Sequence, residues 1–242
     1  QMHLGTQLIW SARFTDGIHA LENAIPQLRS LGNRNGVYFG SVSLGIGLVL
    51  TGEYQRSEAI LTPLIPEAER GGSPREAAVG LLALGMAVLA EGRVAPALEY
   101  FQQSVTRYRQ MQFAGELGWA LASLALAQEA TGQPQAASAS LTEALNIAAQ
   151  THSMFTMIAG LAAMVTCLAR RGHEQAALRV HRLALMQPVH QNSRWYAQII
   201  GDEIALQWQA LSPAQQAAIE ASAKGHTPFS IIPQVLTLIA PA

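Results

Sequence analysis

The chain has 242 residues, of which 50% are apolar and only 13% are charged. Its 15 lysines and arginines nearly balance its 16 aspartates and glutamates, which gives a formal net charge of -1. Nucleic-acid binding needs a concentrated basic surface, and an anionic membrane attracts clustered basic residues. The composition therefore predicts neither direct nucleic-acid contact nor membrane association for this segment.

The N-terminal part of the chain predicts one irregular helix pair, over residues 2–14 and 17–31. The stretch from Gly32 to Gly36 is rich in glycine and asparagine and predicts a loop. Beyond it, apolar residues recur at helical rather than alternating spacing, so further helices and no strands are predicted. These helices cover residues 37–51, 54–70, 75–91, 94–111, 115–131, 134–150, 155–171, 174–187, 194–211 and 213–224.

Glycine marks the end of four predicted helices, spaced forty residues apart, at Gly52, Gly92, Gly132 and Gly172. A glycine after an apolar helical run suits the left-handed residue that ends a helix, because it has no Cβ to clash. Residues at fixed distances from these glycines repeat as well. Eight residues before the glycines stand Leu44, Leu84, Leu124 and Met164, and five residues after them stand Ser57, Ala97, Ala137 and Ala177. Such a repeat predicts antiparallel helix pairs that stack on one another.

Two more signals concern helix ends. The stretch Ser73–Glu76 predicts a capping box, in which the serine caps the helix and the glutamate reaches back to it. Residues 227–240 predict a short last helix that covers the final pair.

We therefore expect an all-α fold, a superhelical stack of about five to six antiparallel helix pairs with a C-terminal capping helix. The expected unit is a single domain over residues 1–242. Its predicted repeats are approximately 1–33, 37–72, 74–112, 114–152, 154–190 and 194–225, with the cap at 227–240. Because the chain begins with Gln1 rather than methionine, we expect it to be a segment of a longer protein.

Cys167 is the only cysteine, so the sequence allows neither an internal disulfide nor a cysteine-based zinc site. Its neighbours are apolar, and a small core residue is the expected role. The cysteine usage predicts reducing, cytoplasmic surroundings.

The repeated columns resemble the tetratricopeptide family. The matching positions are Leu44-Gly45 and Leu84-Gly85 in first helices, and Ala97, Phe101 and Ser104 in a second helix. The first-helix aromatic of the family is absent, and the period is forty residues where the family has 34. The longer repeat and the tail from Asn192 to Gly225 resemble the helical-repeat region of large bacterial transcriptional regulators of the MalT-like and AfsR types. In those regulators a nucleotide-binding switch domain precedes the repeats.

The resemblance implies a concave groove lined by the first helix of each pair. Carried over to this chain, the groove residues are Phe39, Val42, Ile46, Val79, Leu82, Met86, Trp119, Leu126 and Glu129, with Arg170 beside them to fix an acidic group. Arg171 and Arg194 are further candidates for that task, although arginines near helix C-termini also serve the helix dipole. Two interpretations stay open. These side chains pack against one another in a tightly curved stack, or they bind an apolar peptide, a helix or a small ligand, with Trp119 and Met86 as anchors.

No motif for catalysis is present. The sequence has no phosphate-binding glycine loop, no paired histidines at metal-ligand spacing and no serine elbow. We therefore predict no enzyme activity, no cofactor and no metal. The leading hypothesis is a protein-interaction or effector-sensing module of a larger cytoplasmic transcriptional regulator, and the alternative is a freestanding scaffold that assembles proteins through the same groove. The oligomeric state is not predicted.

Overall fold

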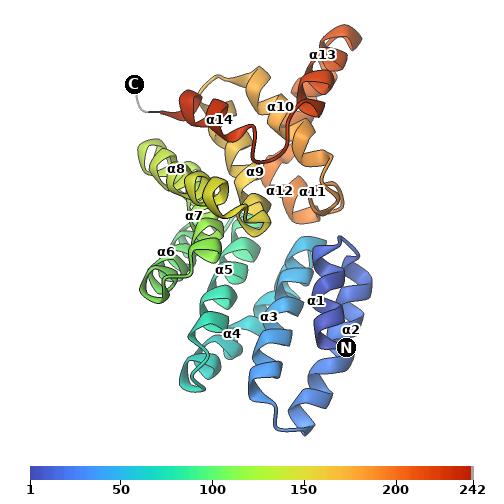
Figure 1. Ribbon diagram of the computed structural model, residues 1–242, viewed down its shortest axis with the longest axis vertical. Helices are drawn as coiled ribbons and strands as arrows, with labels where there is room; N and C mark the ends of the chain where they lie inside the picture. Colours follow the sequence, from blue (N-terminus) through green and yellow to red (C-terminus); the bar gives the residue numbers. More distant parts are fainter. Residues whose placement is uncertain (241–242) are drawn as a thin grey trace. The chain divides into compact units, whose positions relative to one another are not determined.

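The computed structural model describes residues 1–240 (Figure 1), so the last two residues of the predicted 1–242 domain lie outside the described residues. Within this range the chain is helical, without strands. The helices are α1 (Met2–Trp10), α2 (Phe14–Ser30), α3 (Arg34–Thr51), α4 (Tyr54–Arg70), α5 (Pro74–Ala90), α6 (Val94–Met111), α7 (Ala114–Ala130), α8 (Pro134–Thr151), α9 (Met154–Arg170), α10 (Glu174–Leu185), α11 (Pro188–Gln191), α12 (Arg194–Gln209), α13 (Pro213–Lys224) and α14 (Ile232–Ile239).

The helices pack as two compact units. Unit 1 comprises Gln1–Gln112 and the short segment Asn192–Trp195, and unit 2 comprises Phe113–Gln191 and the described residues from Tyr196 onwards. Consecutive helices pack against each other from α1 to α6 in unit 1 and from α7 to α11 in unit 2, where α13 packs against α10. The first helix of one pair also contacts the first helix of the next, as α3 does with α5 and α7 with α9. The predicted all-α stack of helix pairs is confirmed, whereas the single domain stays a prediction.

The turns show a regularity finer than the forty-residue repeat. A residue with positive φ occurs every twenty residues from position 12 to position 172. Six of these residues are glycines, and the other three are Ala12, Gln112 and His152. From α2 to α9 the helices thus have 17 or 18 residues, and each is followed by a turn with one left-handed residue. The predicted role of Gly52, Gly92, Gly132 and Gly172 is confirmed, since their φ values lie between 72° and 84°.

Gln112→Gly is expected to stabilise the protein by about 0.5–1 kcal/mol, because a left-handed backbone strains a side chain but not glycine. Gln112 has φ 58° and is exposed, so little packing is lost. Gly72→Ala is the matched control one repeat earlier, where φ is 78° and a Cβ would have open space. Urea unfolding should give changes of opposite sign. A neutral or destabilising Gln112→Gly would contradict the account.

The core depends on small residues in the first helices. A Cβ atom at Gly45 would lie 2.7 Å from Leu61, and one at Gly85 would overlap the Phe101 ring. Leu61 and Phe101 stand forty residues apart and are fully buried. In these two pairs the large side chain of the second helix therefore packs into the space that glycine leaves on the first helix.

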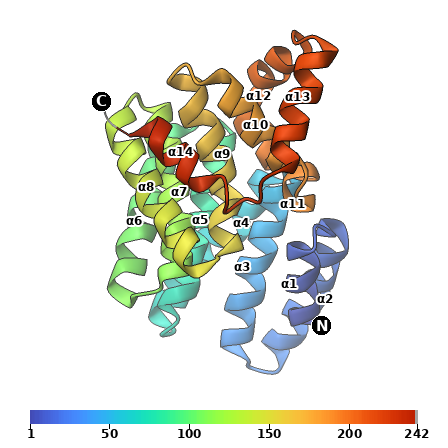
Figure 2. The same cartoon turned by 45° about the horizontal axis from the view of Figure 1, so that its top comes forward.

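Three predictions about helix ends are wrong. Ser73 makes no cap hydrogen bond, because its Oγ donates to Asn35 Oδ1 at 3.2 Å in the preceding pair. The predicted helix 194–211 is broken at Gly201, whose φ is 69° and ψ −179°. The last helix begins at Ile232 and packs against α8 and α9 rather than over the final pair (Figure 2). Its apolar face packs against these earlier helices because Ile232, Val235 and Ile239 are buried there.

Candidate binding cleft

The residues predicted to line a concave groove are mostly inside the protein. Val42, Ile46, Leu82, Met86, Trp119, Leu126 and Glu129 are buried, Phe39 and Val79 are half-buried, and Arg170 is exposed. Leu82 and Met86 have no exposed surface at all, so in this structure they belong to the core.

In unit 1 the surface of α5 at Met86 is covered by the chain itself. The indole Nε1 of Trp195 donates a 3.0 Å hydrogen bond to the Met86 carbonyl, and the Trp195 side chain is fully buried. Met86 was predicted to contact a partner, but in the structure a tryptophan 109 residues later in the same chain contacts it. This contact anchors the segment Asn192–Trp195 to unit 1.

In unit 2 the predicted polar groove residues bind one another. Arg171 forms a 2.5 Å ion pair with the buried Glu129 carboxylate, and Arg170 donates to the Glu129 carbonyl. Trp119 stacks on Phe155 with ring centroids 6.3 Å apart. Cys167 is fully buried, and burial raises the pKa of its thiol far above the ordinary value. Its predicted role as a small core residue is confirmed.

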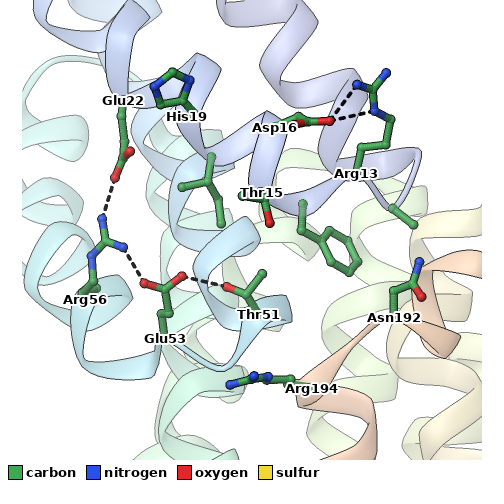
Figure 3. A pocket seen from close by; sticks show the side chains of 13 residues that line it. Arg13, Thr15, Asp16, His19, Glu22, Thr51, Glu53, Arg56, Asn192 and Arg194 are labelled. Atoms are coloured by element: carbon green, nitrogen blue, oxygen red, sulfur yellow. Dashed lines mark hydrogen bonds and ion pairs between the residues drawn. The ribbon is translucent and has the colours of Figure 1, made fainter.

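A cleft of about 770 Å³ opens at one end of the helix pairs of unit 1 (Figure 3). Three segments meet there: the α1–α2 turn with the start of α2, the α3–α4 turn with the start of α4, and the anchored segment after α11. The lining residues are Ala12, Arg13, Phe14, Thr15, Asp16, Ile18, His19, Glu22, Thr51, Glu53, Arg56, Asn192 and Arg194.

The charges in this cleft are unevenly paired. Arg13 forms a 2.6 Å ion pair with Asp16. Arg56 lies between two carboxylates in Figure 3, pairing with Glu22 at 2.5 Å and also with Glu53. These hydrogen bonds, the one to Glu53 first, raise the pKa of Arg56 further. The side chains are substantially exposed, so these pairs add little stability. Because the single positive charge of Arg56 serves two carboxylates, one negative charge beside it is not neutralised.

Arg194 is the arginine of the cleft that pairs with no carboxylate among the described residues. Its stem lies across the α3–α4 turn, where a Cβ on Gly52 would come within 3.2 Å of Arg194 Cδ. The adjacent Trp195 holds this stem in place. Burial and Glu91 raise the pKa of nearby Tyr54, and the positive charge of Arg194 opposes that shift. A guanidinium in this position presents a planar pair of donors suited to a carboxylate or a phosphate.

The polar groups of the cleft include the Thr51 hydroxyl. The Thr51 hydroxyl lies 3.1 Å from the Gly47 carbonyl of its own helix and 3.2 Å from Glu53 Oε1, a carboxylate that also pairs with Arg56 (Figure 3). Within residues 1–240, no three histidine, cysteine, aspartate or glutamate side chains gather as metal ligands do. Over the same range, no helix has the length and apolarity needed to cross a membrane.

Sequence reasoning identified Arg194 as an anion-binding candidate but missed the cleft around it. The last lining segment is separated from the other two by more than a hundred residues, and no local pattern predicts that they meet. The sequence analysis treated Asn192–Trp195 only as the start of the C-terminal tail and did not predict its contact with α5.

No protein-family model matches the chain, and no curated protein sequence matches it either.

Proposed function

We propose that this chain is a non-catalytic, effector-sensing module that binds a small zwitterionic ligand in the cleft of unit 1. The observation that carries the proposal is the uneven pairing of the charges there: Arg56 serves both Glu22 and Glu53, whereas Arg194 has no carboxylate. A carboxylate or phosphate group of the ligand binds Arg194, with the Asn192 amide beside it. An ammonium group binds at the excess carboxylate.

Ligand binding would act by favouring the conformation in which the three segments that line the cleft are together. The cleft is lined by three segments, within residues 12–22, 51–56 and 192–194. A ligand that contacts all three stabilises the state in which they are together, and it shifts the population toward that state in proportion to its differential affinity. The resemblance of the repeats and tail to bacterial regulators supports placing this module in a larger cytoplasmic transcriptional regulator, where such a shift is passed to a switch domain.

The test is a thermal-unfolding screen of the whole chain against the proteinogenic amino acids. Acetate and inorganic phosphate serve as anions without an ammonium group. We expect at least one amino acid to raise Tm, since a ligand at a hundred times its Kd adds about 2.7 kcal/mol of stability. Arg194→Gln should abolish the rise, and Glu53→Gln should weaken it.

The matched control is Arg29→Gln, which removes an exposed arginine of α2 that does not line the cleft. This variant should respond to the ligand like the wild type. The proposal fails if no compound of the panel shifts Tm, or if Arg194→Gln responds as fully as Arg29→Gln. Failure of the whole panel would favour the alternative, a scaffold that binds only macromolecules.

A further inference from the structure

The C-terminal segment lies across unit 2, along α8. Phe229 approaches His152 at the C-terminal end of α8, with ring centroids 5.4 Å apart, and Ile239 reaches Ser138 near its start. Figures 1 and 2 both draw α14 beside α8 and α9, which are its packing partners. Ile232 and Val235 are buried whereas Thr237 is exposed. The helix α14 is therefore amphipathic, and its apolar face is seated in a groove.

The polar contacts of α14 are made by α8, by His173 just before α10, and by Arg179 of α10, which donates to Gln234 Oε1 at 3.1 Å. Ser138 Oγ donates to the Ile239 carbonyl at 2.9 Å. His173 Nε2 lies 3.1 Å from the Leu238 carbonyl and must be the donor, because a carbonyl only accepts. Both carbonyls belong to the last turn of α14, where helix carbonyls lack intrahelical donors. The groove thus recognises the C-terminal end of a helix by its free carbonyls.

The Ser138 hydroxyl is oriented by a buried chain of contacts. Arg171 Nη2 donates to Ser138 Oγ at 2.8 Å, which directs the hydroxyl proton toward Ile239. Arg171 in turn pairs with Glu129 at 2.5 Å and donates to the Cys167 carbonyl at 2.8 Å. Ser138 and Glu129 are both buried. This network belongs to the groove and not to α14, so it would meet any helix end that docked there in the same way.

The helix α14 is a separable element. The preceding helix α13 ends at Lys224, and α14 packs on the earlier helices α8 and α9 rather than completing a pair. Helices as short as α14, with eight residues, are not stable alone in water. Its order therefore depends on the groove, and short elements with few packing partners open locally at low cost.

We propose that the groove of α8, α9 and α10 is a docking site for an amphipathic helix of a partner protein, with α14 as its intramolecular occupant. The partner helix carries branched apolar side chains at the spacing of Ile232, Val235 and Ile239 and ends with two free carbonyls over Ser138 and His173. A cleft of about 480 Å³ at this end of α14, lined in part by Arg171 and His173, gives access from solvent. This site lies in unit 2 and does not depend on the ligand cleft of unit 1.

The test uses a fluorescent peptide of residues 226–240 as the probe and the full chain as its receptor, with binding followed by anisotropy. Val235→Asp in the chain places a charge on the buried face of α14 and empties the groove. The apparent affinity of a site rises by the inverse of its free fraction, so Val235→Asp should bind the peptide at least about tenfold more tightly than wild type. Thr237→Asp adds the same charge on the exposed face and should bind like wild type.

The groove side is tested in the Val235→Asp background. Ser138→Ala removes the donor to the peptide carbonyl, and loss of one hydrogen bond should weaken binding about fivefold. Circular dichroism checks that the helices remain, and Val235→Ala replaces Val235→Asp if they do not. Equal peptide affinity for Val235→Asp and Thr237→Asp would overturn the proposal, as would binding that Ser138→Ala leaves unchanged.

Discussion

Trp195→Ala is expected to lower the free energy of unfolding by about 3–5 kcal/mol, the range measured when a large buried aromatic side chain is truncated. Trp195 is fully buried, and its indole makes the 3.0 Å hydrogen bond to the Met86 carbonyl. The substitution removes both the packing and the anchor of the segment Asn192–Trp195. Arg194 would then lose its fixed position in the cleft, so the ligand response should fall together with stability.

Two further variants separate packing from hydrogen bonding. Trp195→Phe keeps most of the buried area and removes the N–H, so it should cost about 0.5–1.5 kcal/mol. Trp208→Ala truncates a half-buried tryptophan that lies under the Arg182 guanidinium at 4.5 Å, and it should cost less than Trp195→Ala. Urea unfolding measures all three. A loss below about 1 kcal/mol for Trp195→Ala would show that the side chain does not anchor the segment.

The protein should lose stability as the pH falls from about 6.5 toward 4, because burial lowers the pKa of both His181 and His190 to about 4. The unfolded chain binds these protons near pH 6.5 and the folded chain does not, so folding is opposed by acid. Each histidine contributes at most about 1.4 kcal/mol per pH unit over this window, and together they give up to about 3 kcal/mol per unit.

The surroundings of the two rings explain the shifts. His181 stacks on Tyr196, lies 3.1 Å from its hydroxyl through Nδ1 and has Arg182 as a neighbour that disfavours a second positive charge. His190 donates from Nε2 to the Met157 and Ile158 carbonyls at 3.1 and 3.2 Å, and its buried Nδ1 has no hydrogen-bond partner among the described residues. Protonating that nitrogen would bury an unsatisfied N–H.

The measurement is urea unfolding at intervals between pH 7.5 and 4.5, values chosen to span the window set by the two pKa shifts. The double variant His181→Leu with His190→Gln should show a much flatter dependence than wild type. The control is His19→Gln, which removes an exposed histidine and should leave the slope unchanged. A slope in the double variant equal to that of wild type would contradict the assignment.

Much of the fold follows from local sequence. Gly92 and Gly132 end apolar helical runs at positions where only glycine enters the left-handed region without strain, so the helix boundaries around them were predicted within a residue or two. The columns of small and large residues, such as Gly85 and Phe101, likewise predict that the two helices of a pair pack closely. These features depend on residues less than twenty positions apart.

The sequence did not predict the left-handed turns at Gln112 and His152. Both adopt the left-handed conformation of the glycine turns, yet neither residue type signals it. The stacking of neighbouring pairs requires the same turn at each position and outweighs the local preference. The twenty-residue period was therefore hidden from the sequence, although the forty-residue period was plain.

The sequence by itself determined the helices, their turns and their pairing, because each depends on contacts between residues that are close in the chain. Only the tertiary structure decided the surfaces proposed for binding. The bond from Trp195 to Met86 spans 109 residues, and the bond from Ser138 to Ile239 spans 101. Neither helical periodicity nor a turn signal records such a contact, since it depends on how whole helices stack. Arg194 gains its cleft, and α14 its groove, only after that stacking is complete.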